Sequence, residues 1–145
     1  MKKMLVGLDG SERERSVLGA AIALGRNTGA KLVLFRCIGL PEAHALPPDV
    51  SESIDPQQIP KLIEGRAKMH LESLGNHVPQ ELRGGLRVVV GIPWQSIERV
   101  AEQEDADLIV IGSHGYSGID RVIGTTAAKV VDHADRSVLV VRNRR

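Results

Sequence analysis

The sequence predicts an α/β fold: a single doubly wound domain in which a five-stranded parallel sheet of order 3-2-1-4-5 is flanked by about four helices. The length of 145 residues suits one domain with a full hydrophobic core, and we expect it to span residues 1–145. Short aliphatic runs alternate with longer segments of helical periodicity, which is typical of βαβ units. Several runs, such as residues 108–111, lack polar alternation, as expected for strands that helices cover on both faces.

The first strand, the first helix and the second strand are predicted within the first 38 residues. Residues 3–8 form an almost entirely apolar run, which predicts the first strand. A helix is predicted from residue 11 to about residue 27, because Ser11 and Glu14 have the spacing of a capping box. Apolar residues then recur along one face of this helix. The next aliphatic run, residues 30–38, predicts the second strand.

The middle of the chain contains the least regular segment. Residues 39–60 include five prolines, so we expect no regular structure there. A helix over about residues 61–76 and a strand over residues 86–90 follow from the apolar spacing. Pro93 suits the first turn of another helix. Residues 107–112 form the fourth aliphatic strand.

A glycine-rich stretch, GSHGYSGIDRVIGTT at residues 112–126, follows the fourth strand. The apolar spacing of residues 125–134 predicts the last helix, and residues 137–142 are predicted as the last strand. In a doubly wound sheet, ligands bind beyond the carboxyl ends of the strands, where the winding direction reverses. Asp9, which ends the first strand, and Gly112, which ends the fourth, are therefore expected on the same rim.

The glycine-rich stretch has the chemistry of a phosphate cradle. Glycines allow backbone N–H groups to approach a phosphate closely, and a helix N-terminus provides free amides. Gly124 precedes the last helix, where Thr125 and Thr126 add hydroxyl donors, and Ser113 adds another. The alternative is a tight strand-to-helix connection with a threonine as N-cap and no ligand. From this stretch alone both interpretations stay open, because its spacing matches neither a P-loop nor Gly-x-Gly-x-x-Gly.

Composition excludes several function classes. The formal net charge is +1, with acids and bases interspersed and only three aromatic residues, which argues against nucleic acid as a partner. The single cysteine, Cys37, allows no internal disulfide and no multi-cysteine zinc site. No segment reads as a signal peptide or a membrane span, so we expect a cytoplasmic protein with no membrane partner.

Three segments together resemble the universal stress protein family. They are KKMLVGLDGSE at the start, VVVGIPWQSIERVAEQEDADLIVIGSHG in the second half, and the glycine-rich stretch with the strand that follows it. The resemblance implies a five-stranded parallel α/β domain, a homodimer and, in the nucleotide-binding branch, a Gly-x2-Gly-x9-Gly-Ser/Thr motif for ATP phosphates. Here eight residues lie between Gly115 and Gly124 instead of nine, and Tyr116 stands where similar members often have Arg or Lys.

The resemblance implies a set of site residues. The resemblance implies that Asp9 contacts the nucleotide or its Mg²⁺. It also implies that the backbone at Cys37 and Ile38 contacts adenine. The predicted nucleotide-binding residues are Leu8, Asp9, Cys37, Ile38, Gly112, Ser113, His114, Gly115, Gly124, Thr125, Thr126 and Ala127. ATP is the expected cofactor, with ADP or AMP as alternatives, and no catalytic residue is predicted.

Three functions compete at this point. The first is an ATP-binding regulatory module that acts as a homodimer in stress response. The second is a dimeric interaction scaffold of the same family without a nucleotide, and the third is a slow ATP hydrolase. A homodimer is expected in the first two because the last strand lies at a sheet edge and has a bare aliphatic run. That run consists of Val138, Leu139, Val140 and Val141.

Overall fold

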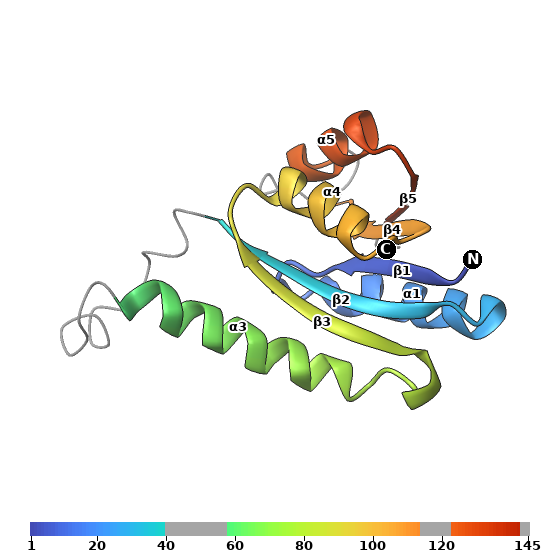
Figure 1. The fold of residues 1–145 in the computed structure, drawn as a ribbon, viewed down its shortest axis with the longest axis horizontal. Coiled ribbons are helices and arrows are strands. Elements are labelled where there is room, and N and C mark those ends of the chain that lie inside the picture. Colours follow the sequence, from blue (N-terminus) through green and yellow to red (C-terminus); the bar gives the residue numbers. More distant parts are fainter. Residues whose placement is uncertain (40–57, 114–122, 143–145) are drawn as a thin grey trace.

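The computed structural model describes residues 1–39, 58–113 and 123–142, and it confirms the predicted fold class. A single α/β domain contains a five-stranded, all-parallel sheet in the order β3-β2-β1-β4-β5 (Figure 1). The strands are β1 (Lys3–Gly7), β2 (Lys31–Ile38), β3 (Arg83–Val90), β4 (Leu108–Gly112) and β5 (Ser137–Val141). The α-helices of the described residues are α1 (Glu14–Thr28), α3 (Ile59–Gly75), α4 (Pro93–Gln103) and α5 (Thr125–His133).

β1 lies in the middle of the sheet and pairs with strands from both halves of the chain. Val6 lies opposite Leu34 of β2 on one side and Val110 of β4 on the other. The chain winds outward from β1 through β2 to β3, and then returns to add β4 and β5 on the opposite side. The carboxyl ends of β1 and β4 therefore adjoin at the point where the winding reverses.

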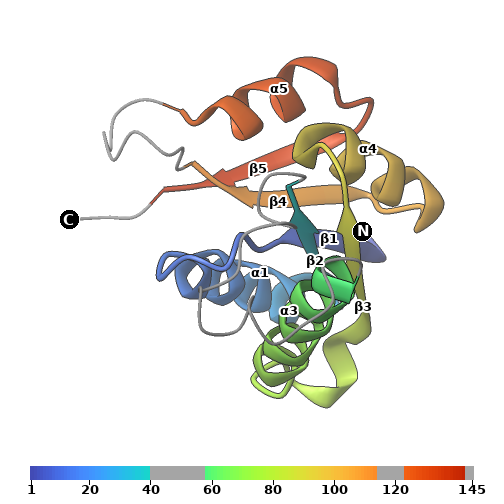
Figure 2. The ribbon, with the colours of Figure 1, turned by 90° about the vertical axis from the view of Figure 1, so that its left-hand side faces the viewer.

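Helices cover both faces of the sheet, as Figure 2 shows, with α1 and α3 on one side and α4 and α5 on the other. Alternate residues of each strand enter separate cores. In β1, Met4 and Val6 pack in the core beneath α1 and α3, whereas Leu5 packs in the core beneath α4 and α5. The interiors of β1 and β4 are apolar and buried on both faces for this reason.

Two elements in the middle of the chain begin earlier than the sequence predicts. β3 begins at Arg83, three residues earlier than predicted, with Gly84 and Gly85 inside the strand. Gly85 has φ +132°, and the pairing register between β2 and β3 shifts beside it, so the strand continues through a local irregularity. α3 begins at Ile59, with Pro60 in its first turn, where a proline needs no N–H partner. Residues 40–57 of the predicted irregular segment lie outside the described residues.

The predicted capping box at the start of α1 does not form. The N-cap position is Arg13, whose side chain makes no cap hydrogen bond, and α1 begins at Glu14 itself. The carboxylate of Asp9 accepts hydrogen bonds from both the backbone N–H and the hydroxyl of Ser11, at 2.9 and 2.6 Å. Because the Ser11 N–H is taken, the Glu14 carboxylate accepts instead from the N–H of Gly10, at 2.9 Å.

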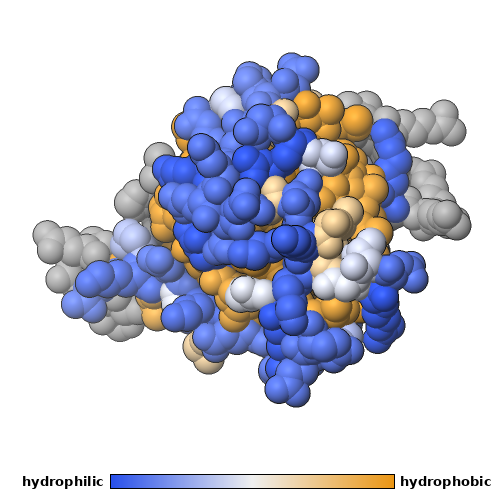
Figure 3. Space-filling model, turned by 45° about the vertical axis from the view of Figure 1, so that its right-hand side comes forward, coloured by the Kyte–Doolittle hydropathy of each residue, from blue (hydrophilic) through white to orange (hydrophobic). Residues whose placement is uncertain are grey.

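Apolar residues are not confined to the two cores. Figure 3 shows hydrophobic surface between hydrophilic regions on one face of the molecule. Among the described residues, Val131 of α5 and Leu139 of β5 are large apolar side chains that are 52% and 37% exposed. Every helix in the described parts of the chain is too short or too polar to cross a membrane.

Candidate functional site

A cavity of about 420 Å³ lies beyond the carboxyl ends of β1, β2, β4 and β5. Its apolar wall comes from both sides of the sheet, with Val17 of α1 on one side and Phe35 and Ile97 on the other. The polar part of its lining comes mainly from the loop between β1 and α1 and from the start of α5. The cavity therefore lies at the switch point that the sheet order defines.

Most of the predicted site residues that the structure describes meet in this cavity. Those that line it are Leu8, Asp9, Cys37, Gly112, Thr125, Thr126 and Ala127. Ile38 does not line the cavity: its side chain packs in the core, and its carbonyl accepts a hydrogen bond from Gly91 N–H at 3.0 Å. His114 and Gly115 lie outside the described residues.

Ser113 and Gly124 do not line the cavity, but their backbones connect the elements that do. Ser113 is buried, its N–H donates to the carbonyl of Val141 at 2.9 Å, and its carbonyl accepts from Gly124 N–H at 2.8 Å. The start and the end of the glycine-rich stretch are thus joined to each other and to β5. This pairing brings the beginning of α5 against the end of β4.

The N-terminus of α5 faces the cavity. Gly124 is the N-cap residue, and no side chain of the described residues caps this helix, so the threonine N-cap of the alternative interpretation does not form. The helical bonding begins with Ala128 N–H, which donates to Gly124 C=O at 2.9 Å. The N–H groups of Thr125, Thr126 and Ala127 therefore have no partner in the helical ladder and carry the positive end of its dipole.

Two glycines at the cavity also allow close packing of the side chains around them. A Cβ atom on Gly7 would stand 3.0 Å from Cγ2 of Ile111, and one on Gly112 would stand 3.2 Å from Cγ2 of Val17. Both distances are tighter than ordinary contacts between side chains. Bare backbone at these positions therefore serves the packing of α1 and the sheet, whether or not a ligand approaches.

The structure adds charged residues to the site that sequence reasoning missed. Arg13, Glu14 and Arg36 line the cavity together with Asp9. The Arg36 guanidinium donates to the carbonyl of Cys37 at 3.2 Å, so it lies over the end of β2. A signal was present, because Arg13 and Glu14 lie within five residues of Asp9 and Arg36 precedes Cys37. The sequence does not indicate which way these side chains point.

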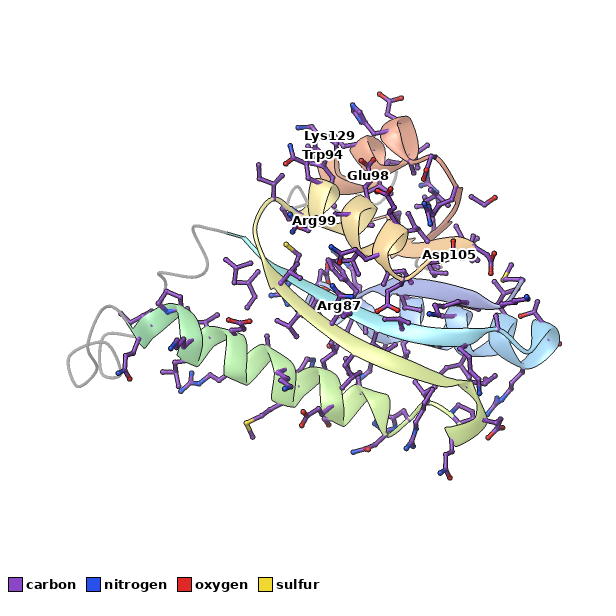
Figure 4. All side chains as sticks on the ribbon, in the orientation of Figure 1. Arg87, Trp94, Glu98, Arg99, Asp105 and Lys129 are labelled. Atoms are coloured by element: carbon purple, nitrogen blue, oxygen red, sulfur yellow. The ribbon has the colours of Figure 1, made fainter. Side chains whose placement is uncertain are left out.

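An aromatic and cationic cluster joins α4 to α5 next to the cavity. The rings of Trp94 and His133 lie 4.6 Å apart between centroids. The ammonium of Lys129 lies 5.6 Å from the centroid of the Trp94 ring, and Figure 4 labels both of these side chains. The cation and the tilted imidazole ring both favour this contact. Pro93, which precedes Trp94, and Ile97, one turn further along α4, line the cavity, so this cluster helps to hold the wall that the two helices share.

The described residues contain no group of three or more His, Cys, Asp or Glu side chains that could hold a metal ion. Asp9 is exposed at the cavity, and one of its oxygens accepts the two hydrogen bonds from Ser11. A divalent cation would therefore need most of its ligands from a bound molecule or from water.

The fold and the site define a class: a doubly wound α/β protein with a ligand-sized cavity at the switch point of its sheet. Within that class, the chain belongs to the universal stress protein family, whose model matches residues 1–142.

Known proteins similar to this chain support the assignment along its whole length. Universal stress protein Sll1388 of Synechocystis sp. is 33% identical over 150 residues, which cover 97% of each chain. The solved structure of MJ0577, a universal stress protein of Methanocaldococcus jannaschii, has a TM-score of 0.80 at 25% identity and covers 99% of this chain and 97% of its own. A universal stress protein from Archaeoglobus fulgidus, solved in complex with dAMP, has a TM-score of 0.65 at 22% identity and 98% coverage of both chains, a likeness in fold.

Proposed function

We propose that this protein binds an adenine nucleotide in the cavity at the switch point and acts as a regulatory homodimer of the universal stress protein family in stress response. The observation that carries the proposal is the convergence of three features on one cavity: Gly112, the first amides of α5, which have no partner in the helical ladder, and the cations Arg13 and Arg36. Backbone amides and guanidinium groups are the donors that phosphate groups prefer. The dAMP complex of the Archaeoglobus fulgidus relative supports an adenine nucleotide as the ligand. Action in the cytoplasm is part of the same proposal.

The cavity suits a molecule with an apolar part and an anionic part. Its volume of about 420 Å³ lies within the range of ligand pockets, which is roughly 300–1,000 Å³. In the proposed arrangement, the apolar wall around Phe35 and Ile97 holds the base, and the backbone at Cys37 supplies polar contacts to its edge. The phosphates lie against Gly112 and the amides of Thr125 and Thr126.

Mg²⁺ is proposed to enter with the nucleotide and not as a resident ion. Asp9 is the residue that would hold it, alongside oxygens of the phosphates and water, since Mg²⁺ often uses one or two carboxylates in this way. When bound, the ion would neutralise phosphate charge. Asp9 would orient the hydrated ion, while Ser11 keeps the Asp9 side chain in place through its two hydrogen bonds.

The shortened glycine-rich stretch bears on which nucleotide binds. Eight residues separate Gly115 from Gly124, and Tyr116 occupies a position where similar members often have a cation. These differences concern the far end of the phosphate chain. We therefore expect ADP to bind almost as tightly as ATP, with AMP as the next ligand to compare.

The homodimer is proposed to form through β5. This strand lies at the edge of the sheet and presents Val138, Leu139 and Val140 without a charge or a proline to block pairing. The opposite edge strand, β3, carries Arg83 and Arg87 and an irregular backbone, features that protect an edge from pairing. Antiparallel pairing of two β5 strands about a two-fold axis would cover the exposed edge.

The test of nucleotide binding is thermal unfolding of the purified protein with and without Mg-ATP, Mg-ADP and AMP, with Mg-GTP as a control for the base. At about a hundred times the dissociation constant, linkage adds roughly 2.7 kcal/mol of stability. For a domain of this size, that stabilisation corresponds to a rise in Tm of roughly 5–10 °C. Isothermal calorimetry then gives the stoichiometry.

The outcome also separates the competing functions. An unchanged Tm at saturating Mg-ATP, ADP and AMP, with no nucleotide copurifying, would contradict the proposal and favour the scaffold. Phosphate release that is proportional to enzyme concentration and sustained over many turnovers would favour the hydrolase. Binding without turnover is the result expected for the regulatory module.

A further inference from the structure

The carboxylate of Glu14 is buried between two elements that are far apart in the sequence. Its side chain is 6% exposed, although it belongs to the first turn of α1 and lines the cavity. One oxygen, Oε2, accepts the N–H of Gly10 at 2.9 Å, and the other, Oε1, contacts Nε2 of His70 on α3. His70 itself is half exposed, so the contact reaches from solvent to the cavity lining.

Gly10 is the residue through which this contact affects the cavity. It has φ +80° and lies between Asp9 and Ser11, which both line the cavity. A Cβ atom at Gly10 would stand 3.3 Å from the guanidinium of Arg36, so the turn fits closely against that side chain. The hydrogen bond that Gly10 N–H donates to the Glu14 carboxylate therefore fixes the backbone of the turn that presents Asp9.

A buried carboxylate requires partners, because its desolvation is costly unless hydrogen bonds or opposite charges compensate. Arg13 and Arg36 line the same cavity and contribute positive charge near it, and Asp9 contributes negative charge. His70 is the partner that α3 supplies. Without His70, Oε1 of Glu14 loses its contact with α3. Rotation of the carboxylate toward water then becomes favourable, and it breaks the hydrogen bond with Gly10 N–H.

We propose that His70 is a positioning residue for the nucleotide cavity: it holds Glu14, and Glu14 holds the turn at Gly10 that carries Asp9. The inference rests on the proposed function for its effect on nucleotide affinity. Under this proposal, the nucleotide affinity of the cavity depends on the placement of α3. Among the described residues, this helix contributes none to the cavity lining.

The experiment compares His70→Ala, His70→Gln and the control His77→Ala in the full-length protein. Gln places an amide N–H near the position of the imidazole Nε2, so it can restore the donor. His77 is an exposed histidine just beyond the end of α3. The first readout needs no ligand: hydrogen exchange of the Gly10 amide, followed by NMR, relative to the amides of β4.

In His70→Ala we expect faster exchange at Gly10 than in the wild type, with the protection of β4 amides retained. The affinity for Mg-ADP is expected to fall roughly three- to tenfold, within the net range of one ordinary hydrogen bond, because His70 acts on the nucleotide only through Glu14 and Gly10. His70→Gln should recover most of both effects, and His77→Ala should show neither.

Three results would overturn the inference. The first is an unchanged exchange rate of the Gly10 amide in His70→Ala. The second is an equal loss of protection at Gly10 and in β4, which indicates general destabilisation. The third is that His70→Gln recovers neither the Gly10 protection nor the Mg-ADP affinity. If the wild type binds no nucleotide, the proposed function fails, but the Gly10 exchange still decides whether His70 positions the turn.

Discussion

The backbone N–H of Gly124 donates a hydrogen bond to the carbonyl of Ser113 at 2.8 Å, which closes the base of the glycine-rich stretch. Ser113 follows β4 directly, and Gly124 is the N-cap of α5. The strand end and the helix start are therefore held at one place on the rim. This arrangement, more than any single side chain, aims the free amides of α5 at the cavity.

Replacement of Gly112 by valine is expected to abolish most of the nucleotide-induced rise in Tm. The added Cβ alone would stand 3.2 Å from Cγ2 of Val17, and the further methyl groups would occupy space at the cavity lining. Thermal unfolding with saturating Mg-ADP measures the effect. Gly65→Val is the matched control, because Gly65 lies in α3 and a Cβ there meets nothing within 4 Å. Equal Tm rises in both variants would contradict the assigned role.

Replacement of Leu139 by aspartate is expected to produce a monomer. Leu139 is 37% exposed on β5, and a charge at this position would be buried without a partner in the proposed strand pairing. Sedimentation velocity at about tens of micromolar, a concentration suited to a weakly associating pair, measures the change. Met69→Asp on α3, where the side chain is 70% exposed, should remain dimeric. A monomeric wild type would rule out the proposed dimer.

Two glycines of α1 should respond in opposite directions to alanine. A Cβ at Gly19 meets nothing within 4 Å, so Gly19→Ala should stabilise the protein by about 0.5–1 kcal/mol through helix propensity. A Cβ at Gly25 would stand 2.9 Å from Cδ1 of Leu32, so Gly25→Ala should destabilise it by roughly 1–3 kcal/mol. Urea denaturation measures both variants. Stabilisation by both substitutions would show that packing at Gly25 does not outweigh propensity, and destabilisation by both would contradict the expectation for Gly19.

Asp107 is expected to contribute to the acid limb of the stability profile. Hydrogen bonds from the backbone N–H groups of Lys2 and Lys3 hold the pKa of its carboxyl below the usual value. A carboxyl whose pKa is lower in the folded state stabilises the fold above its unfolded pKa of about 4, and this contribution is lost as the pH falls through the folded pKa.

Asp107→Asn should therefore flatten the decline of Tm between about pH 5 and pH 2, because Asn has no carboxyl to protonate. The measurement is thermal unfolding across that range. Asp132→Asn, at an exposed position of α5, serves as the comparison. If the dependence of Tm on pH has the same shape in Asp107→Asn as in the wild type, these two hydrogen bonds do not affect acid stability.

Much of the fold was predictable because hydrophobic periodicity depends on local spacing. β4, predicted over residues 107–112, is Leu108–Gly112 in the structure, and α5, predicted over residues 125–134, is Thr125–His133. The rim was predictable as well, since parallel strands place their carboxyl ends together. Asp9 and Gly112 meet in one cavity for that reason.

The sequence by itself determined the elements, their class and the edge of the sheet where the cavity lies. The tertiary structure decided which polar atoms pair. Ser11 and Glu14 have the spacing of a capping box, yet Ser11 N–H donates to Asp9. The Glu14 carboxylate instead accepts from Gly10 N–H and contacts His70. Spacing specifies which partners are within reach along the chain. The choice among them depends on groups that only the folded chain brings together, because a buried carboxylate must take whichever donors lie beside it.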